Sequence, residues 1–301
     1  MMMRKISIGS FLWRARLQRS VYFNNSIGFC TSCLKQVKDG NGVAVLFPGQ
    51  GSQFVGMATD IGHRNVVKDL YRRASELLEG CNAAAGFSVG EFSALVVAGA
   101  ISFEDAIRIV KYRSESMQRA SDRRKTGMLT TLGLDLEQNQ QICNKVASEI
   151  LGDDGILQVA NVLFHNCCVL AGDIRGLHHI KDNYRQLGFK RVRQLPVSGA
   201  FHTPAMSEVQ SSLKEALQNV EITMPIYDVY SNVTAGEYRS VSEIISLLQE
   251  QVTKPVLWEQ SIKSIYDKFK CDHWYEFGPG TQLTTTIKKI LPKVNVYNLK
   301  V

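Results

Sequence analysis

The sequence Ala83-Ala-Ala-Gly-Phe-Ser-Val-Gly-Glu-Phe92 decides the fold of this chain. Small apolar residues lead into the pattern Gly86-x-Ser88-x-Gly90, and apolar residues then recur at helical spacing. In a sharp turn between a buried strand and a helix, the serine adopts a strained backbone conformation. Glycines on both sides lack the Cβ atoms that would collide where the strand and the helix pack together. The stretch therefore predicts a nucleophile elbow that exposes the Ser88 hydroxyl.

The helix that follows Ser88 supplies hydrogen-bond donors for an oxyanion. The first backbone N–H groups of a helix have no intrahelical acceptor, and the positive end of the helix dipole lies at the same place. We therefore predict the N–H of Val89 as the first donor of an oxyanion hole. Glu91 could be the acid of a catalytic triad. An acid in a first helical turn more often complements the helix dipole, and we adopt that interpretation.

The net charge of +7 comes from the first part of the chain. No acidic residue precedes Asp39, and without the basic residues before it, 28 Lys and Arg stand against 28 Asp and Glu. Those basic residues are Arg4, Lys5, Arg14, Arg16, Arg19, Lys35 and Lys38. The charge therefore does not indicate a nucleic-acid-binding surface. An arginine-rich, hydroxyl-containing, acid-free start is typical of a mitochondrial targeting leader, which we place at residues 1–38.

Apolar runs and cysteines exclude two further classes of protein. No apolar run approaches the roughly 20 residues that span a bilayer, so membrane insertion is not expected. The chain has seven cysteines without regular spacing, which is not a disulfide framework and suits a reducing compartment. Cys30-x-x-Cys33 lacks a second ligand pair, so we do not expect a zinc site there.

A parallel sheet is predicted around the elbow. Val43-Ala-Val-Leu-Phe47 has the pattern of a buried strand and opens into Pro48-Gly-Gln-Gly-Ser-Gln53. No Lys-Ser or Lys-Thr follows the glycines, which disfavours a phosphate loop and makes Gln50 a candidate oxyanion or substrate contact. An amphipathic helix over Asn65–Glu79 and a strand over Asn82–Gly86 complete a β-α-β unit.

A second helix begins near Ser102 and carries Arg113, and the chain changes character from Thr126 onward. The order strand-helix-strand-strand-helix-strand predicts a ferredoxin-like small domain over residues 126–196, inserted into a core formed by 39–125 and 197–301. The expected elements are strands over Met128–Leu134, Ile156–Val162, Cys167–Ile174 and Arg191–Val197, and helices over Leu136–Ile150 and Leu177–Leu187.

His202 is the candidate general base. Ser198-Gly-Ala-Phe-His-Thr-Pro204 places it in a turn of small residues before an apparent helix from Ala205. We expect the main sheet to resume just before this turn, near Val197. An isolated histidine is usually solvated or structural. With Ser88 in need of a base, His202 becomes its predicted partner.

Several motifs together resemble the malonyl-CoA:acyl carrier protein transacylases in their mitochondrial form. The motifs are Leu46-Phe-Pro-Gly-Gln-Gly-Ser-Gln53, Gly86-Phe-Ser-Val-Gly-Glu91, Lys111-Tyr-Arg-Ser-Glu-Ser-Met-Gln118, Gly199-Ala-Phe-His202, Ser231-Asn-Val233, Pro255-Val-x-Trp258 and Glu276-Phe-Gly-Pro-Gly280. The resemblance extends from about residue 42 to the end. It implies an α/β-hydrolase-like parallel-sheet core with the inserted ferredoxin-like domain.

The resemblance also implies roles for single residues. It makes Ser88 the nucleophile and His202 the base, with the main-chain carbonyl of Gln251 orienting His202. The N–H groups of Gln50 and Val89 would form the oxyanion hole. Arg113 would hold the malonyl carboxylate, and Phe201 would leave no room for an α-methyl group. A guanidinium fork suits a carboxylate better than an ammonium group does. The alternative for Arg113 is a surface helix position, where it pairs with Glu115 or Asp105.

The implied reaction transfers malonyl from malonyl-CoA, through a serine ester, to the phosphopantetheine thiol of acyl carrier protein. It needs no metal or redox cofactor and belongs to fatty acid synthesis in the mitochondrial matrix. One alternative is a serine esterase or thioesterase, which passes the acyl group to water. Another is an inactive accessory form, because the interval between the Gln50 loop and Ser88 is shorter than the family usually has.

Overall fold

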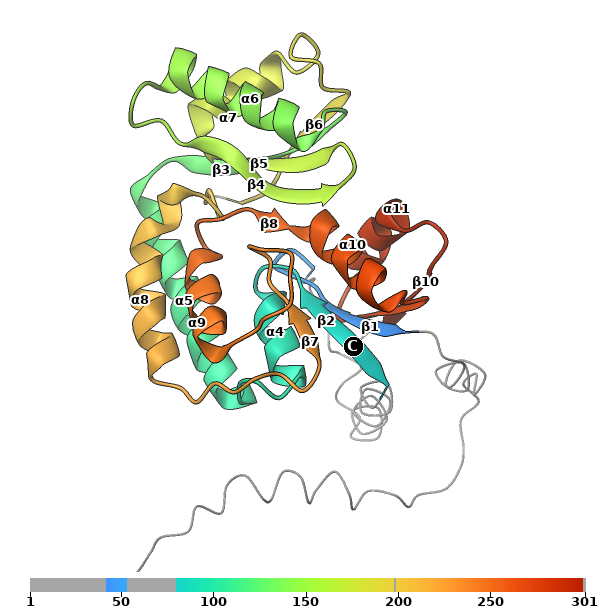
Figure 1. Cartoon of the computed structure of the whole chain (residues 1–301). Helices are drawn as coiled ribbons and strands as arrows, with labels where there is room; N and C mark the ends of the chain where they lie inside the picture. Colours follow the sequence, from blue (N-terminus) through green and yellow to red (C-terminus); the bar gives the residue numbers. More distant parts are fainter. Residues whose placement is uncertain (1–41, 53–79, 198, 300–301) are drawn as a thin grey trace, which may run out of the picture. The chain divides into compact units, whose positions relative to one another are not determined.

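The computed structural model describes residues 42–52, 80–197 and 199–299. They all fall within the unit formed by residues 37–301. A parallel sheet with the order β10-β9-β1-β2-β7 lies at its centre (Figure 1). Its strands are β1 (Val43–Phe47), β2 (Cys81–Gly86), β7 (Asp228–Tyr230), β9 (His273–Phe277) and β10 (Asn295–Leu299). This main sheet confirms the predicted α/β class with a parallel core.

Helices cover both faces of the main sheet, which explains the unbroken apolar run of β1. Val43, Val45 and Phe47 contribute to the core on one face, and Ala44 and Leu46 to the core on the other. The first face is covered by α4 (Gly90–Val97), α5 (Phe103–Arg123), α8 (Ser207–Gln218) and α9 (Val241–Glu250). The second face is covered by α10 (Trp258–Phe269) and α11 (Gln282–Ile290).

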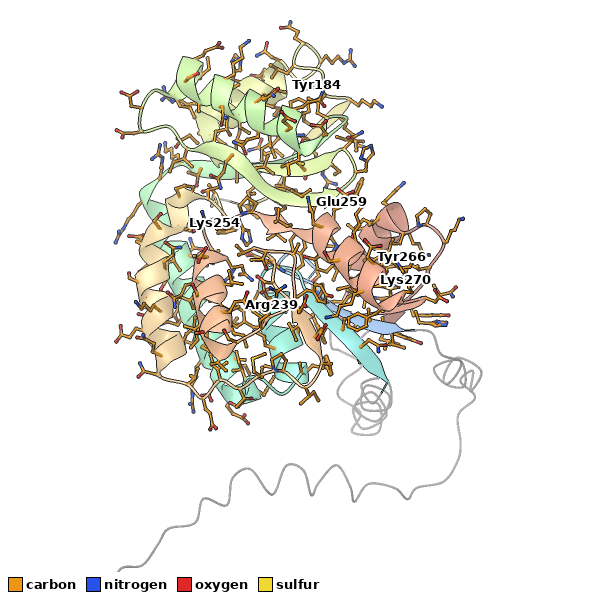
Figure 2. All side chains as sticks on the ribbon, viewed as in Figure 1. Tyr184, Arg239, Lys254, Glu259, Tyr266 and Lys270 are labelled. Carbon is orange, nitrogen blue, oxygen red and sulfur yellow. The ribbon has the colours of Figure 1, made fainter. Side chains whose placement is uncertain are left out.

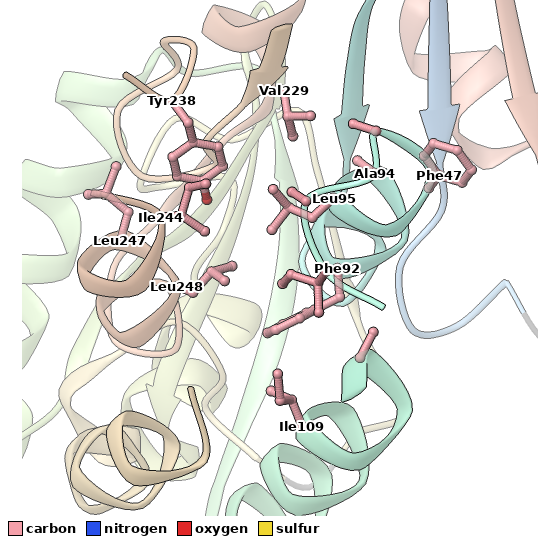
Figure 3. Close-up of a cluster of buried hydrophobic side chains, with 14 of the residues drawn as sticks. Phe47, Phe92, Ala94, Leu95, Ile109, Val229, Tyr238, Ile244, Leu247 and Leu248 are labelled. Carbon is pink, nitrogen blue, oxygen red and sulfur yellow. The ribbon is translucent and has the colours of Figure 1, made fainter. Parts of the chain in front are cut away.

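The larger of these cores packs the helix after the elbow against its neighbours. Figure 3 shows Phe92 and Leu95 of α4 facing the side chains of α9, among them Leu248. Ile109 of α5 and Val229 of β7 belong to the same cluster. All of these side chains are at most 1% exposed, so the elbow helix is fixed from several directions.

The nucleophile elbow lies between β2 and α4. Ser88 has a positive φ of 53°, which is uncommon for a residue with a side chain, and the N–H of Phe87 donates to the Phe47 carbonyl over 2.9 Å. A Cβ atom at Gly86 would come within 1.9 Å of the Gly90 oxygen, and one at Gly90 within 2.2 Å of the Phe47 oxygen. Glycine is required at both places, which confirms the predicted strand-to-helix turn.

A second sheet, which we call the small sheet, has the order β6-β3-β5-β4-β8. Its strands are β3 (Thr126–Leu132), β4 (Leu157–Phe164), β5 (Cys167–Asp173), β6 (Arg191–Gln194) and β8 (Val256–Leu257). The first four pair antiparallel, whereas β8 joins β4 in parallel. Residues of α6 (Leu136–Val146) and α7 (Ile174–Asp182) pack on one face, and a short π-helix, η3 (Ala147–Leu151), follows α6.

Several predicted boundaries need correction. The helix predicted over Leu177–Leu187 begins at Ile174 and ends at Asp182, where the Asn183 side chain donates to the His179 carbonyl over 2.9 Å and satisfies the helix end. The strand predicted to reach Val197 stops at Gln194, just before Pro196, which has no N–H to donate.

The main sheet also does not resume near Val197. The chain instead returns to the core through the turn that carries His202, the short 3₁₀ helix η4 (Pro204–Met206) and α8, and its next core strand is β7. The motif Pro255–Trp258 contributes Val256 and Trp258 to the core on the second face of the main sheet. It supplies β8 of the small sheet and the first residue of α10.

Some predictions lie outside the described residues, namely the leader, the amphipathic helix over Asn65–Glu79 and the Cys30-x-x-Cys33 pair. The cysteines that the structure describes are free. In the described ranges, no helix combines the length and the apolar composition needed to cross a bilayer.

We predict that Gly86→Ala destabilises the protein, because its Cβ atom would overlap the backbone of Gly90. Overpacking of this kind costs at least about 1–3 kcal/mol of unfolding free energy. Gly236→Ala is the matched control, since the nearest atom to its Cβ is the Thr234 hydroxyl at 3.7 Å. Urea denaturation measures both variants. Equal midpoints would show that the close approach of β2 and α4 is not what fixes the elbow.

Candidate active site

Ser88 and His202 lie together in the folded chain. Ser88 Oγ is 2.9 Å from Nε2 of His202, and Nδ1 of His202 is 2.7 Å from the carbonyl oxygen of Gln251. A carbonyl only accepts hydrogen bonds, so Nδ1 carries the proton and Nε2 is free to accept from the serine hydroxyl. The arrangement can deprotonate Ser88 as the hydroxyl attacks an acyl carbon.

The turn that carries His202 is anchored to the small sheet. His202 has a positive φ of 61°, which is unusual for a residue with a side chain, so the surrounding structure must hold its backbone in this conformation. The Ala200 N–H donates to the Thr126 hydroxyl of β3 over 3.0 Å. The Gln158 amide of β4 donates to the His202 carbonyl over 3.0 Å. The position of His202 against Ser88 therefore depends on both sheets.

His202 is a neutral imidazole at neutral pH. Burial lowers its pKa to about 4, and the nearby positive charge of Arg113 acts in the same direction. The carbonyls of Gln251 and Lys254 oppose this by accepting hydrogen bonds that favour the protonated ring. A neutral, buried imidazole is the form that can accept a proton.

Asn232 supports the elbow from the end of β7, and the sequence interpretation assigned it no role. Its side-chain oxygen accepts from the Ser88 N–H over 2.7 Å, and its side-chain nitrogen donates to the Gly86 carbonyl over 2.7 Å. The Ser88 N–H and the Gly86 carbonyl of the strained turn therefore both have hydrogen-bond partners. The available signal was the amide residue in the Ser231-Asn-Val233 motif, which follows β7 where parallel strands present their carboxyl ends at one edge.

The two predicted oxyanion donors lie near the elbow. Val89 immediately precedes α4, where the helix itself offers its N–H no acceptor. Gln50 lies in the exposed turn after β1, and the neighbouring Gly49 is so close to Phe87 that a Cβ would come within 2.6 Å of its carbonyl oxygen. Gln282 of α11 donates to the Gly51 carbonyl over 2.8 Å and ties this turn down.

Arg113 is buried and points at the serine. Its side chain comes from α5, the residue is 5% exposed, and Nη2 donates to Ser88 Oγ over 3.2 Å. The alternative surface position is wrong, because Asp105 pairs with Arg108 and Glu115 with Lys111. Among the described residues Nε of Arg113 has no hydrogen-bond partner. Burial lowers the pKa of Arg113 to about 10, which still leaves a cation at neutral pH.

Glu91 does more than complement a helix dipole, which corrects our interpretation. It is 1% exposed and accepts hydrogen bonds from the Tyr238 hydroxyl, the Asn232 N–H and the Gln251 side chain. The orienting contact of His202 goes to the Gln251 carbonyl, so Glu91 is not the third member of a triad. Burial raises the pKa of Glu91 to about 7, against the opposing effect of these hydrogen bonds.

Gln251 connects all of these groups. It is completely buried directly after α9, and besides its carbonyl it uses both ends of its side-chain amide. Oε1 accepts from Arg113 Nη2 over 3.0 Å, and Nε2 donates to the Ser88 carbonyl over 3.0 Å and to Glu91 Oε2 over 2.5 Å. The sequence prediction concerned its carbonyl alone.

Phe201 is half-buried beside His202. It packs against both the main core and a cluster on the second face of the small sheet. Its ring lies over Gly199, where a Cβ atom would come within 2.5 Å of it. The ring therefore closes one side of the His202 turn.

A separate cavity of about 380 Å³ adjoins the His202 turn. It is lined by Gln158, Pro204, Thr253 and Lys254 among others, and Figure 2 labels Lys254 between α9 and β8. Ser88 and Arg113 are not among its lining residues. Within the described ranges no group of three or more His, Cys, Asp or Glu side chains could hold a metal ion.

Comparisons with known proteins agree with this geometry. The family model described as "Acyl transferase domain" matches residues 80–291. The chain is 36% identical over 295 residues to the mitochondrial malonyl-CoA-acyl carrier protein transacylase of Homo sapiens, covering 81% of this chain and 76% of that protein.

Solved structures of similar proteins share the fold. The malonyl CoA-acyl carrier protein transacylase of Coxiella burnetii superposes with a TM-score of 0.77 at 26% identity, covering 86% of this chain and 94% of that one. A malonyl-transacylase in complex with its type II PKS acyl-carrier protein superposes with a TM-score of 0.77 at 27% identity, covering 86% and 96%.

Proposed function

Because the chain belongs to the acyl transferase domain family, and within it to the malonyl-CoA-acyl carrier protein transacylases, we propose that it transfers malonyl from malonyl-CoA to acyl carrier protein. The acceptor is the phosphopantetheine thiol of the carrier, and the pathway is mitochondrial fatty acid synthesis. The observation that carries the substrate assignment is the Arg113 guanidinium, which is buried next to the Ser88 hydroxyl and has an unpaired Nε–H among the described residues.

The first half-reaction forms a malonyl ester on Ser88. His202 Nε2 takes the hydroxyl proton while Ser88 Oγ attacks the thioester carbon. The N–H groups of Val89 and Gln50 donate to the oxyanion of the tetrahedral intermediate. The carbon–sulfur bond then breaks, and the protonated His202 returns its proton to the departing CoA thiolate.

The second half-reaction reverses these roles. His202 accepts the proton of the carrier thiol, whose sulfur attacks the ester carbon, and Ser88 leaves with that proton. The route uses residues of this chain alone and calls for no metal or redox cofactor. A serine esterase or thioesterase would share the first step and pass the acyl group to water. Arg113 favours transfer of a carboxylated acyl group, because a hydrolase for plain acyl groups gains nothing from a buried cation at the nucleophile.

Substrate selection follows from Arg113 and Phe201. A malonyl carboxylate that enters the buried site loses its water, and a charged hydrogen bond to the guanidinium compensates for this desolvation. Phe201 lies beside the base, where its ring would exclude an α-methyl group and favour malonyl over methylmalonyl. Gln251 holds His202 through its carbonyl in this proposal.

We also propose the finer domain organisation. Residues 39–125 and 197–301 form an α/β-hydrolase-like core, supported by the parallel main sheet and the elbow at the end of β2. Residues 126–196 form an inserted ferredoxin-like domain. Its support is the element order β3-α6-β4-β5-α7-β6 and the antiparallel order β6-β3-β5-β4.

We predict that Ser88→Ala abolishes the covalent malonyl adduct and that His202→Ala slows its formation. An unassisted hydroxyl is a weak nucleophile, and loss of a general base costs roughly a hundredfold to ten-thousandfold in rate. Intact-mass measurement after mixing with malonyl-CoA detects the adduct. An adduct that persists on Ser88→Ala means another nucleophile, and no adduct on the unchanged protein means an inactive accessory form.

We predict that Arg113→Ala lowers malonyl transfer by at least roughly tenfold to a hundredfold, because hydrogen bonds to charged groups contribute about 1.5–3 kcal/mol each. Acetyl transfer should hold or rise, since Ser88 and His202 stay in place. Arg108→Ala on the same helix is the control, because Arg108 is exposed and pairs with Asp105. Parallel loss of both acyl transfers would show that Arg113 only supports its helix.

We propose that residues 1–38 are a targeting leader that directs the protein to the mitochondrial matrix, supported by their basic, acid-free composition and by the name of the human relative. We predict that a chain beginning at Asp39 retains malonyl transfer and that the intact chain, tagged at its C-terminus, is recovered with matrix proteins. Cytosolic location of the intact chain, or loss of transfer on shortening, would contradict this.

A further inference from the structure

Glu91 is a buried carboxylate that no step of the proposed reaction uses. It lies on α4 three residues after the nucleophile and is 1% exposed. Its Oε1 accepts from the Tyr238 hydroxyl, and its Oε2 accepts from the Asn232 N–H over 3.3 Å and from Gln251 Nε2 over 2.5 Å. A buried charge is costly to keep unless it is balanced, so the partner that balances Glu91 is informative.

Gln251 relays the charge of Glu91 to Arg113. A carboxylate can only accept, so Glu91 turns the amide nitrogen of Gln251 toward itself. The amide oxygen then faces Arg113 Nη2 at 3.0 Å. In the described part of the chain Arg113 forms no ion pair within 4.0 Å, yet its charge and that of Glu91 act on each other.

The separation of Glu91 from Arg113 leaves guanidinium donors available for a substrate. If Glu91 formed a direct fork with Arg113, the guanidinium donors would be occupied before a substrate arrived. With the amide between them, Glu91 balances the cation from a distance, and Nε of Arg113 keeps a free donor among the described residues. The resting site thus contains one buried cation and one buried anion.

A substrate carboxylate on Arg113 changes this balance, because two carboxylates then share one guanidinium. Like charges in a site of low dielectric disfavour each other, and one of the two gains a proton. The substrate carboxylate contacts the guanidinium directly and remains ionised. Glu91 acts on the guanidinium only through the Gln251 amide, so Glu91 is the carboxylate that takes up the proton.

We propose that Glu91 is a positioning residue of the carboxylate site, which balances Arg113 through the Gln251 amide and takes up a proton from solvent when a substrate carboxylate binds Arg113. The inference rests on the proposed function. Glu91 is the counter-charge of Arg113 in the resting site, and the substrate carboxylate replaces it. Because Glu91 is then protonated, the buried site does not gain an excess negative charge.

The hydrogen bonds around Glu91 can accommodate this proton. Placed on Oε1, it would be donated to the Tyr238 oxygen, and the Tyr238 hydroxyl would turn to the Ser231 side chain within its reach. Oε2 would continue to accept from Asn232 and Gln251. The orientation of the Gln251 amide, and with it the position of Arg113, would be preserved.

The other titratable groups around Glu91 keep their charge state near neutral pH. Arg113 of α5 has a pKa of about 10, the pKa of buried His202 is about 4, and burial holds the pKa of Tyr238 well above its usual value. The negative charge of Glu243 on α9 also raises the pKa of Tyr238, and Asp228 of β7 pairs with Lys268 at the surface. Glu91, with its pKa raised to about 7 by burial, is the group that titrates.

Calorimetric binding to the full chain carrying Ser88→Ala, which blocks acyl transfer, tests the proposal. Titrations in two buffers of different ionisation enthalpy at pH 7.5 give the number of protons taken up. We expect malonyl-CoA to take up a fraction of a proton that acetyl-CoA does not. Malonyl-CoA affinity should fall with rising pH by at most about tenfold per unit, because deprotonated Glu91 opposes the substrate carboxylate.

Glu91→Gln in the same background is the matched variant, since it keeps the shape and removes the charge. It should abolish the difference between the two ligands and flatten the pH dependence of malonyl-CoA affinity. Equal uptake for both ligands, or malonyl-specific uptake that persists in Glu91→Gln, would overturn the proposal.

An infrared difference spectrum keeps the proposal testable if Glu91→Gln does not fold. With ¹³C-labelled glutamate in the Ser88→Ala chain, malonyl-CoA should induce a protonated-carboxyl band that carries the isotope shift, and acetyl-CoA should not. Absence of that band with malonyl-CoA bound refutes the inference. Failure of the unmodified protein to form a malonyl adduct on Ser88 would instead refute the proposed function, so the two failures are distinguishable.

Discussion

The hydrogen bonds of Gln251 are the constraint on which the site depends. Its carbonyl fixes the tautomer of His202, its amide oxygen holds Arg113, and its amide nitrogen reaches the Ser88 carbonyl and Glu91. An amide suits this position because it both donates and accepts without a net charge. A shift of the end of α9 would therefore displace the base, the guanidinium and the elbow together. The apolar packing of α9 against α4 keeps that end in place (Figure 3).

The two sheets contribute different parts of this site. The main sheet presents Ser88 and Asn232 at the carboxyl ends of β2 and β7, as a parallel sheet does with its functional residues. The small sheet holds the His202 turn through Thr126 and Gln158. β8 follows Gln251 after a few residues and pairs with β4, the strand that carries Gln158. The distance between Ser88 and His202 thus depends on how the two sheets pack against each other.

The sequence predicted the parts of this arrangement that depend on local chemistry. The glycines around Ser88 have a steric reason that is visible in the spacing alone, and β1 is apolar throughout because both of its faces are buried. His202 was found from its small-residue turn. The Glu91 network could not be found this way, because it joins α4, the segment after β7 and the end of α9, which no periodic pattern links. The end of α7 was also missed, and there the side chain and the backbone N–H of Asn183 both donate to the His179 carbonyl.

The choice of a carbonyl over a carboxylate to orient His202 also follows from the charges. A carboxylate at that position would lie near Arg113 and compete with the substrate for its donors. The neutral carbonyl avoids this, but it leaves His202 with a pKa of about 4, partly because of the positive charge of Arg113. A good general base has a pKa closer to the working pH. In the proposed reaction a substrate carboxylate would lie closer to Arg113 than Glu91 does, and by offsetting the positive charge it would move the pKa of His202 upward. An acetyl group brings no charge to Arg113, so the guanidinium continues to lower the pKa of His202, with Glu91 as its distant counter-charge. In the proposed function, Arg113 would therefore favour a carboxylate in two ways, by binding it and through the basicity of His202.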